Sequence, residues 1–109
     1  MKKSKIEFDI QLDETHTPVL INWSATDSGL EGIKNAKALL LSVFDAREQG
    51  TLRIDLWTKE MMVDEMQQFI YETMRSLADT YVRATGEKEI ADDIRNFSES
   101  FGKKTGLLK

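Results

Sequence analysis

The sequence contains no cysteine, one proline and one histidine in 109 residues. The absence of cysteine excludes disulfide bonds, thiolate metal sites and a cysteine nucleophile. No apolar run approaches the roughly 18 residues that a membrane-spanning helix needs. The N-terminal stretch MKKSKIEFDIQL carries lysines, but it lacks the apolar segment that follows them in a signal peptide. We therefore expect a cytoplasmic protein with no direct membrane insertion.

The charge and the length limit the class of protein further. The net charge is −4, and acidic and basic residues are mixed along the chain, so no concentrated positive field is available for nucleic acid. Hydrophobic residues make up 40% of the chain, as in an ordinary globular domain. We expect one domain over residues 1–102, followed by a frayed tail at residues 103–109. A domain of this size buries little surface, so a homodimer would be a natural source of additional stability.

The N-terminal part of the sequence predicts a β-hairpin. Apolar and polar residues alternate from Ser4 to Leu12 and again after Pro18, which is typical of strands with one buried side. An antiparallel register that places Phe8 opposite Trp23 aligns every apolar residue of one strand with an apolar residue of the other. The same register pairs Leu12 with Val19, Ile10 with Ile21, and Ile6 with Ala25. Trp23 is then a core residue.

The remainder predicts one more strand and three helices. Ser28 and Glu31 resemble a capping box, and apolar residues follow at helical spacing as far as the Gly50 region. A strand is predicted over residues 51–58, and helices from about 63 to 84 and from 87 to 102. The order β-β-α-β-α-α predicts a two-layer α+β fold, in which helices cover one face of a mainly antiparallel three-stranded sheet.

Residues with catalytic or metal-binding potential are few. His16 lies near Asp13 and Glu14 and could act as a general base or a metal ligand, but a single loop histidine is more often merely exposed. The sequence contains no phosphate-binding glycine loop, serine elbow or metal-ligand spacing. We expect no catalytic residues, no metal and no cofactor, so the protein is predicted not to be an enzyme.

Binding residues are easier to propose than catalytic ones. The candidates for partner binding are Leu20, Arg53, Trp57, Met61 and Met62. Leu20, Arg53 and Trp57 fall on the more polar side of the predicted sheet, where an exposed tryptophan would be a binding hot spot. Trp57 could instead tuck under the turn formed by Met61 and Met62. The two methionines precede a predicted helix, where flexible thioethers could support docking.

Three segments of the sequence resemble the gliding-motility protein GldC family of the Bacteroidota. These segments are LINWSATDSG, AKALLLSVFDAREQGTLRIDLWTKEMMVDEMQQF and ADTYVRATG, and the similarity extends from Ile6 to Phe97. The resemblance implies an accessory, non-enzymatic role in surface gliding, a motility linked to the type IX secretion machinery. It implies a protein partner in that machinery and no catalytic residues.

Three hypotheses for the function follow. The first is an interaction module that binds a motility or secretion component. The second is a chaperone-like holdase for exported proteins, with Trp57, Met61 and Met62 forming an adaptable apolar groove. The third is a small-molecule binding domain or enzyme with a pocket between sheet and helices, lined by Phe8 and Trp23. We rank the third last, because the predicted apolar pairs fill that space.

Overall fold

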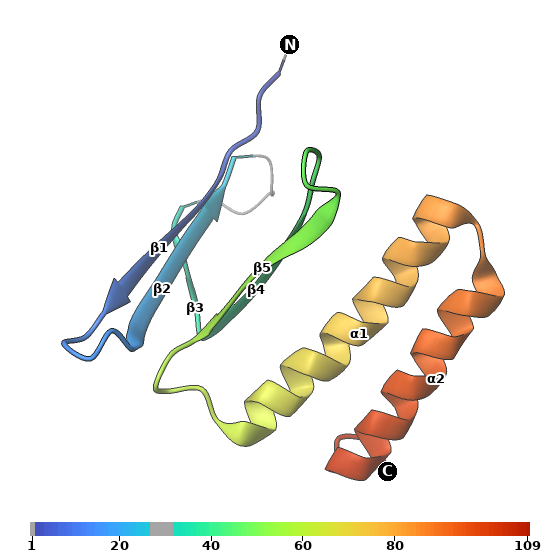
Figure 1. Ribbon diagram of the computed structural model, residues 1–109. Coiled ribbons are helices and arrows are strands. Elements are labelled where there is room, and N and C mark those ends of the chain that lie inside the picture. Colours follow the sequence, from blue (N-terminus) through green and yellow to red (C-terminus); the bar gives the residue numbers. More distant parts are fainter. Residues whose placement is uncertain (1, 27–31) are drawn as a thin grey trace. The chain divides into compact units, whose positions relative to one another are not determined.

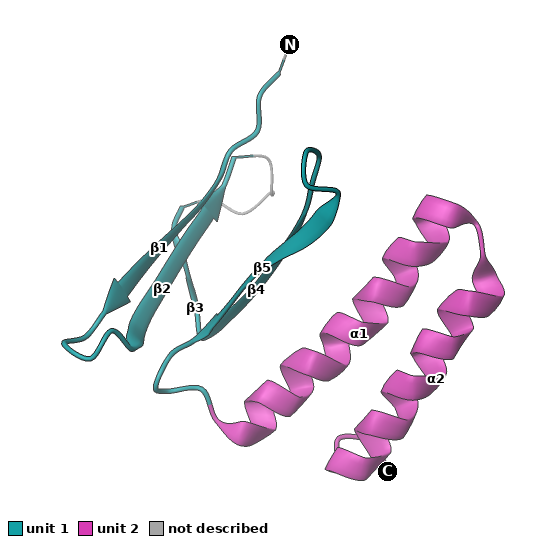
Figure 2. Cartoon of the chain, viewed as in Figure 1, with its two compact units in different colours: residues 1–61 teal, residues 62–109 magenta. Residues whose placement is uncertain are grey.

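A computed structural model describes residues 2–26 and 32–109 of the chain (Figure 1). Within these residues, five strands precede two helices, so the predicted α+β class is confirmed. The elements are β1 (Ile6–Leu12), β2 (Pro18–Ala25), β3 (Lys34–Ala36), β4 (Ala38–Asp45), β5 (Gly50–Trp57), α1 (Val63–Thr85) and α2 (Lys88–Thr105). The chain divides into two compact units, residues 1–61 (unit 1) and residues 62–109 (unit 2), as Figure 2 shows. A single domain over residues 1–102 stays a prediction.

The hairpin of β1 and β2 confirms the predicted register over most of its length. Phe8 pairs with Trp23, Ile10 with Ile21, and Ile6 with Ala25. Near the turn the register shifts between Gln11 and Leu12, so that Leu12 pairs with Pro18 and the predicted pair with Val19 is wrong. One extra residue on β2 accommodates this shift as a β-bulge, which a constant register cannot include.

β2 is the central strand of a three-stranded sheet with the order β1-β2-β3. Ile21 lies at its centre and is fully buried, with Ile10 opposite on β1 and Ala36 opposite on β3. Trp23 is half-buried and lies between Phe8 and Lys34 in the same ladder. The core of this sheet is therefore centred on Ile21.

The predicted helix between residues 28 and 50 is wrong in its described part. Residues 34–36 and 38–45 form β3 and β4, and β4 pairs antiparallel with β5 in a second, two-stranded sheet. Two small sheets thus replace the predicted single three-stranded sheet. The segment ALLLSVF is apolar on both faces of a strand, so its residues also satisfy helical spacing. The predicted capping box at Ser28 and Glu31 lies outside the described residues.

The residues predicted to end that helix form the turn of the β4–β5 hairpin. The Asp45 carboxylate accepts hydrogen bonds from the amides of Arg47, at 3.1 Å, and Glu48, at 2.7 Å. Gln49 lies in the left-handed region, with φ 54°, and completes the turn. The next residue, Gly50, pairs with Asp45. An aspartate that binds amides two and three residues ahead stabilises a tight turn as effectively as it would begin a helix.

The two faces of the β4–β5 sheet differ in composition, because directly opposite residues share a face. The aliphatic face consists of the pairs Leu39–Leu56, Leu41–Ile54 and Val43–Leu52. The mixed face consists of the pairs Ala38–Trp57, Leu40–Asp55, Ser42–Arg53 and Phe44–Thr51. Val43, Leu52 and Ile54 on the aliphatic face are each about half exposed.

Unit 2 is an antiparallel helical hairpin, in which α1 and α2 lie side by side (Figure 1). α1 begins at Val63, as predicted, and its first turn is held by the Glu65 carboxylate, which accepts the Met62 amide at 3.0 Å. It ends at Thr85 and is capped by Gly86, whose φ of 76° suits glycine. No helix among the described residues has the length and apolar character to cross a membrane.

Small residues bring the two helices of unit 2 close together. Ala78 of α1 and Ala91, Ser98 and Gly102 of α2 are buried. The predicted end of the last helix at Gly102 is wrong, since α2 continues to Thr105. The chain then turns back, and the Leu108 amide donates a hydrogen bond to the Gly102 carbonyl at 3.0 Å. Gly102 is therefore a packing position inside the helix.

Candidate functional site

A shallow hollow on unit 1 brings the turn between β1 and β2 next to the end of β5. Its volume is about 270 Å³, and its lining residues are His16, Thr17, Pro18, Asp55, Leu56 and Trp57. We name it the Trp57 groove, after its largest side chain, which is 54% exposed. An indole, an imidazole and a carboxylate thus line one open surface, a combination suited to contact with a partner that has both apolar and polar groups.

Asp13 organises the turn that forms one wall of the groove. Its carboxylate accepts hydrogen bonds from the Thr15 amide at 2.9 Å, the Thr15 hydroxyl at 2.7 Å and the Thr17 amide at 3.0 Å. Its own amide donates to the Thr17 carbonyl at 2.9 Å, and its carbonyl accepts the His16 amide at 3.0 Å. His16 consequently takes up the left-handed region, with φ 63°. The wall is therefore fixed by backbone contacts as well as by side chains.

The other wall, at the end of β5, is tied to the same turn. The Lys59 ammonium forms an ion pair with the Asp13 carboxylate. Thr58, between Lys59 and the groove residue Trp57, is buried, and its amide donates to the Lys37 carbonyl at 2.8 Å. The strand end that carries Trp57 is thus anchored both to Lys37, directly before β4, and to the β1–β2 turn, so the groove is largely preformed.

These contacts change the acidity of Asp13. The Lys59 ammonium, followed by the Thr15 hydroxyl and the Thr17 amide, holds the pKa of Asp13 well below its ordinary value of 3.8. Each of these groups favours the charged carboxylate. A carboxylate whose pKa is lower in the folded state stabilises the fold above its unfolded-state pKa, and this contribution is lost as the pH falls towards the folded-state pKa.

Replacing Asp13 by asparagine is therefore expected to remove part of the acid sensitivity of unit 1. The wild type should be more stable than Asp13→Asn at neutral pH, and the difference should shrink as the pH falls below 3.8. Denaturant titration at a series of pH values, followed by tryptophan fluorescence, measures this difference, because both tryptophans lie in unit 1. Glu14→Gln in the same turn is the matched control. If the wild type remained more stable than Asp13→Asn by the same amount in strong acid, the lowered pKa of Asp13 would be contradicted.

The structure distributes the five predicted binding residues over several places. Trp57 lines the groove, and Arg53 is exposed on the mixed face two positions from Asp55. Leu20 is half-buried on β2, in the other sheet, and so does not share a sheet face with Trp57. Met61 is half-buried in the turn after β5, where its amide donates to Thr58, and the exposed Met62 precedes α1.

Sequence reasoning missed the proximity of His16 and Asp55 to Trp57. The sequence places His16 beside Asp13 and Glu14 in a loop, and Asp55 on a predicted strand far from it along the chain. The Asp13–Lys59 ion pair joins the β1–β2 turn to the residues after β5, and a contact of this kind leaves no periodic signal in the sequence. Among the described residues, no group of three or more His, Asp and Glu side chains could hold a metal ion.

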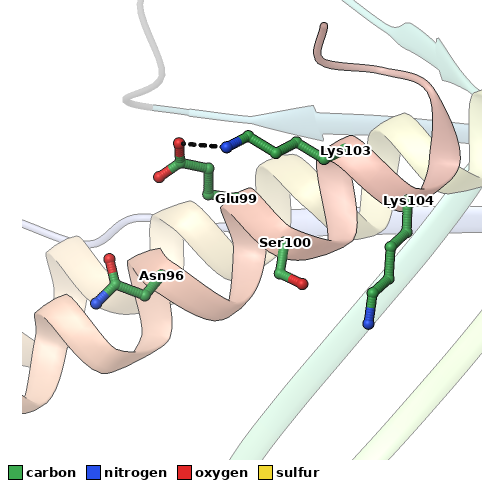
Figure 3. A pocket seen from close by; sticks show the side chains of 5 residues that line it. All are labelled: Asn96, Glu99, Ser100, Lys103 and Lys104. Carbon is green, nitrogen blue, oxygen red and sulfur yellow. Dashed lines mark ion pairs between the residues drawn. The ribbon is translucent and has the colours of Figure 1, made fainter.

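A second hollow lies on α2 and has a volume of about 510 Å³ (Figure 3). Its lining residues are Asn96, Glu99, Ser100, Lys103 and Lys104. Glu99 and Lys103 already pair with each other at 3.5 Å across one helical turn. This surface contains no aromatic side chain and resembles the solvated side of an amphipathic helix, so the Trp57 groove is the stronger candidate.

The chain is thus a small α+β protein with an open groove on unit 1 that is lined by Trp57, His16 and Asp55. The chain belongs to the GldC-like family: the family model described as "Gliding motility-associated protein GldC-like" matches residues 18–107. The match confirms the resemblance noted in the sequence and connects the chain with gliding motility. It includes Asp55, Trp57 and both helices. No curated protein and no solved structure matches the chain.

Proposed function

We propose that this chain is a non-enzymatic accessory protein of bacterial gliding motility. In this proposal it acts in the cytoplasm as an interaction module, and it binds a protein of the gliding or type IX secretion machinery. The family match supports the link to motility. The single observation that carries the binding role is the exposed indole of Trp57 in a groove whose two walls are tied together through Asp13 and Lys59.

Two properties of the groove favour a protein as its ligand. A tryptophan that is half exposed offers a large apolar surface, and residues of this type dominate the binding energy of many interfaces. Because the walls are held in place, little conformational entropy is lost when a partner binds.

The size of the groove argues against a small-molecule site. Pockets for small ligands commonly have volumes of roughly 300–1,000 Å³ and bury most of the ligand. The Trp57 groove has about 270 Å³ and is open to the surface. A groove of this kind suits one or two side chains of a protein segment.

Replacing Trp57 by alanine is expected to weaken partner binding by about tenfold to a hundredfold. The variant removes the apolar anchor but leaves the Asp13–Lys59 tether unchanged. The measurement is recovery of gliding or type IX components with tagged protein from a gliding host, combined with the rate of surface gliding of cells that carry the variant. Both quantities should fall together.

Phe44→Ala provides the matched control for this experiment. Phe44 is 65% exposed on the same mixed face of the β4–β5 sheet, but it does not line the groove. The control should leave recovery and gliding near the wild-type level. Equal loss in the two variants would indicate a general effect on the sheet, and unchanged recovery and gliding in Trp57→Ala would show that the proposed surface is wrong.

A chaperone-like holdase is the alternative, and the exposed apolar side chains of Trp57 and Met62 are the observation that favours it. A holdase would suppress the aggregation of many unfolded proteins at stoichiometric excess, whereas an interaction module would bind one partner. Suppression of aggregation that Trp57→Ala abolishes would favour the holdase. Absence of suppression at excess would remove it.

A further inference from the structure

The strand β5 has an open edge. The amide of Thr58, directly after β5, donates to Lys37 and extends the β4–β5 ladder. The backbone N–H and C=O groups of successive residues point to alternate sides of a strand. The even-numbered residues of β5 therefore direct their N–H and C=O groups towards β4. The residues that direct theirs outward are Thr51, Arg53, Asp55 and Trp57. Within residues 2–26 and 32–109, no strand pairs with this edge and no hydrogen bond reaches those groups.

We propose that β5 pairs with β5 of a second copy of this chain to form a homodimer. The pairing is antiparallel about a two-fold axis at Ile54, so that each copy contributes the same surface. Arg53 then lies opposite the partner's Asp55, and Thr51 lies opposite the partner's Trp57. All four residues are ones whose backbone groups face outward, so both pairs can exchange hydrogen bonds. The two β4–β5 hairpins become one continuous sheet.

Charge selects this register among the possible ones. On the mixed face, Arg53 meets the partner's Asp55, and the two-fold axis repeats the ion pair. Neither residue forms an ion pair with another described residue of its own chain. Shifting the axis by one residue in either direction would place Arg53 opposite the partner's Arg53, or Asp55 opposite the partner's Asp55. Like charges directly opposite each other are unfavourable, so only one register is self-complementary.

The aliphatic face supports the same arrangement. In the proposed register, Ile54 lies opposite the partner's Ile54, and Leu52 lies opposite the partner's Leu56. Leu52 and Ile54 are each about half exposed, as is Val43 beside them on β4. Pairing would join the aliphatic stripes of the two copies and remove part of this apolar surface from water. The register chosen by charge is therefore also the one that centres the apolar side chains.

Two other open strand edges, those of β1 and β4, lack this complementarity. On β1, the centred antiparallel register places Asp9 opposite the partner's Asp9, which is unfavourable. On β4, no charged side chain occurs between Ala38 and Phe44, so nothing on that strand specifies a register. Exposed edge strands normally carry features that prevent pairing, and β1 follows this rule. β5 instead carries alternating charges of opposite sign that fit a second copy.

Charge reversal on the full chain tests this dimer, without any motility partner and independently of the proposed function. Light scattering of the wild type should give twice the chain mass of 12.5 kDa. Arg53→Asp and Asp55→Arg should each raise the dimer dissociation constant at least about tenfold and yield monomers, because each places like charges opposite. The double variant should restore the dimer. An equal mixture of the two single variants should also dimerise, since an acidic edge then meets a basic one.

Asp9→Lys on the β1 edge is the matched control and should remain dimeric. Far-UV circular dichroism verifies that each variant is folded before its mass is interpreted. A monomeric wild type, single variants that stay dimeric, or a mixture of folded single variants that remains monomeric would each overturn the proposal. Recovery of the dimer on mixing supports it directly, because a variant that had merely lost its fold could not be rescued by another one.

Discussion

Replacing Ile21 by alanine is expected to lower the free energy of unfolding of unit 1 by about 3 kcal/mol. Ile21 is fully buried in the central strand β2 and has Ile10 and Ala36 opposite it on the two neighbouring strands. Truncation removes buried methyl and methylene groups and leaves a cavity that the two flanking strands can close only in part. No other large aliphatic side chain among the described residues is buried as completely.

Tryptophan fluorescence is the appropriate measurement for this variant. Trp23 and Trp57 are the only tryptophans, and both lie in unit 1, so their emission reports the unfolding of the sheets rather than of the helices. Ile6→Ala is the matched control, because Ile6 is 66% exposed on β1. Its substitution should cost less than about 1 kcal/mol. Equal losses for the two variants would mean that Ile21 is not the centre of the core.

The β1–β2 hairpin could be predicted from the sequence because its apolar residues occur at every second position on both strands. This pattern has one solution that places all of them on one side, and Phe8 opposite Trp23 follows from it. The starts of α1 and α2 were predictable for a similar reason, since their apolar stripes recur at helical spacing next to turn residues. The bulge at Val19 could not be predicted, because it interrupts the alternation of apolar and polar residues from which the register was inferred.

The β4 strand could not be recognised because its two faces are both apolar. Leu39, Leu40 and Leu41 are consecutive, and a run of this kind satisfies a helix and a buried strand equally well. The turn that follows begins with Asp45 and ends at Gly50, residues that also occur at helix ends. The groove could not be predicted either, because it brings Trp57 near His16, which lies in a turn far from it in the sequence.

Replacing Gly102 by leucine is expected to destabilise the helical hairpin of unit 2 by about 2 kcal/mol. A β-carbon at this position would lie 2.7 Å and 2.8 Å from the Leu108 side chain and 3.0 Å from the Tyr71 ring. The rest of a leucine side chain has no space there unless the returning C-terminal segment or α1 moves. Leucine itself favours helices over glycine by about 1 kcal/mol, so a net loss of stability isolates the steric conflict.

Two companion variants identify the source of that loss. Ser100→Leu, at an exposed position of the same helix, should leave thermal unfolding followed by far-UV circular dichroism unchanged or slightly improved. Adding Leu108→Ala to Gly102→Leu should recover part of the stability, because the nearest clashing side chain is removed. If Gly102→Leu were as stable as Ser100→Leu, the close approach of Leu108 and Tyr71 to α2 would not exist in solution. If the double variant Gly102→Leu/Leu108→Ala regained stability, the returning C-terminal segment would be shown to pack against α2 at Gly102.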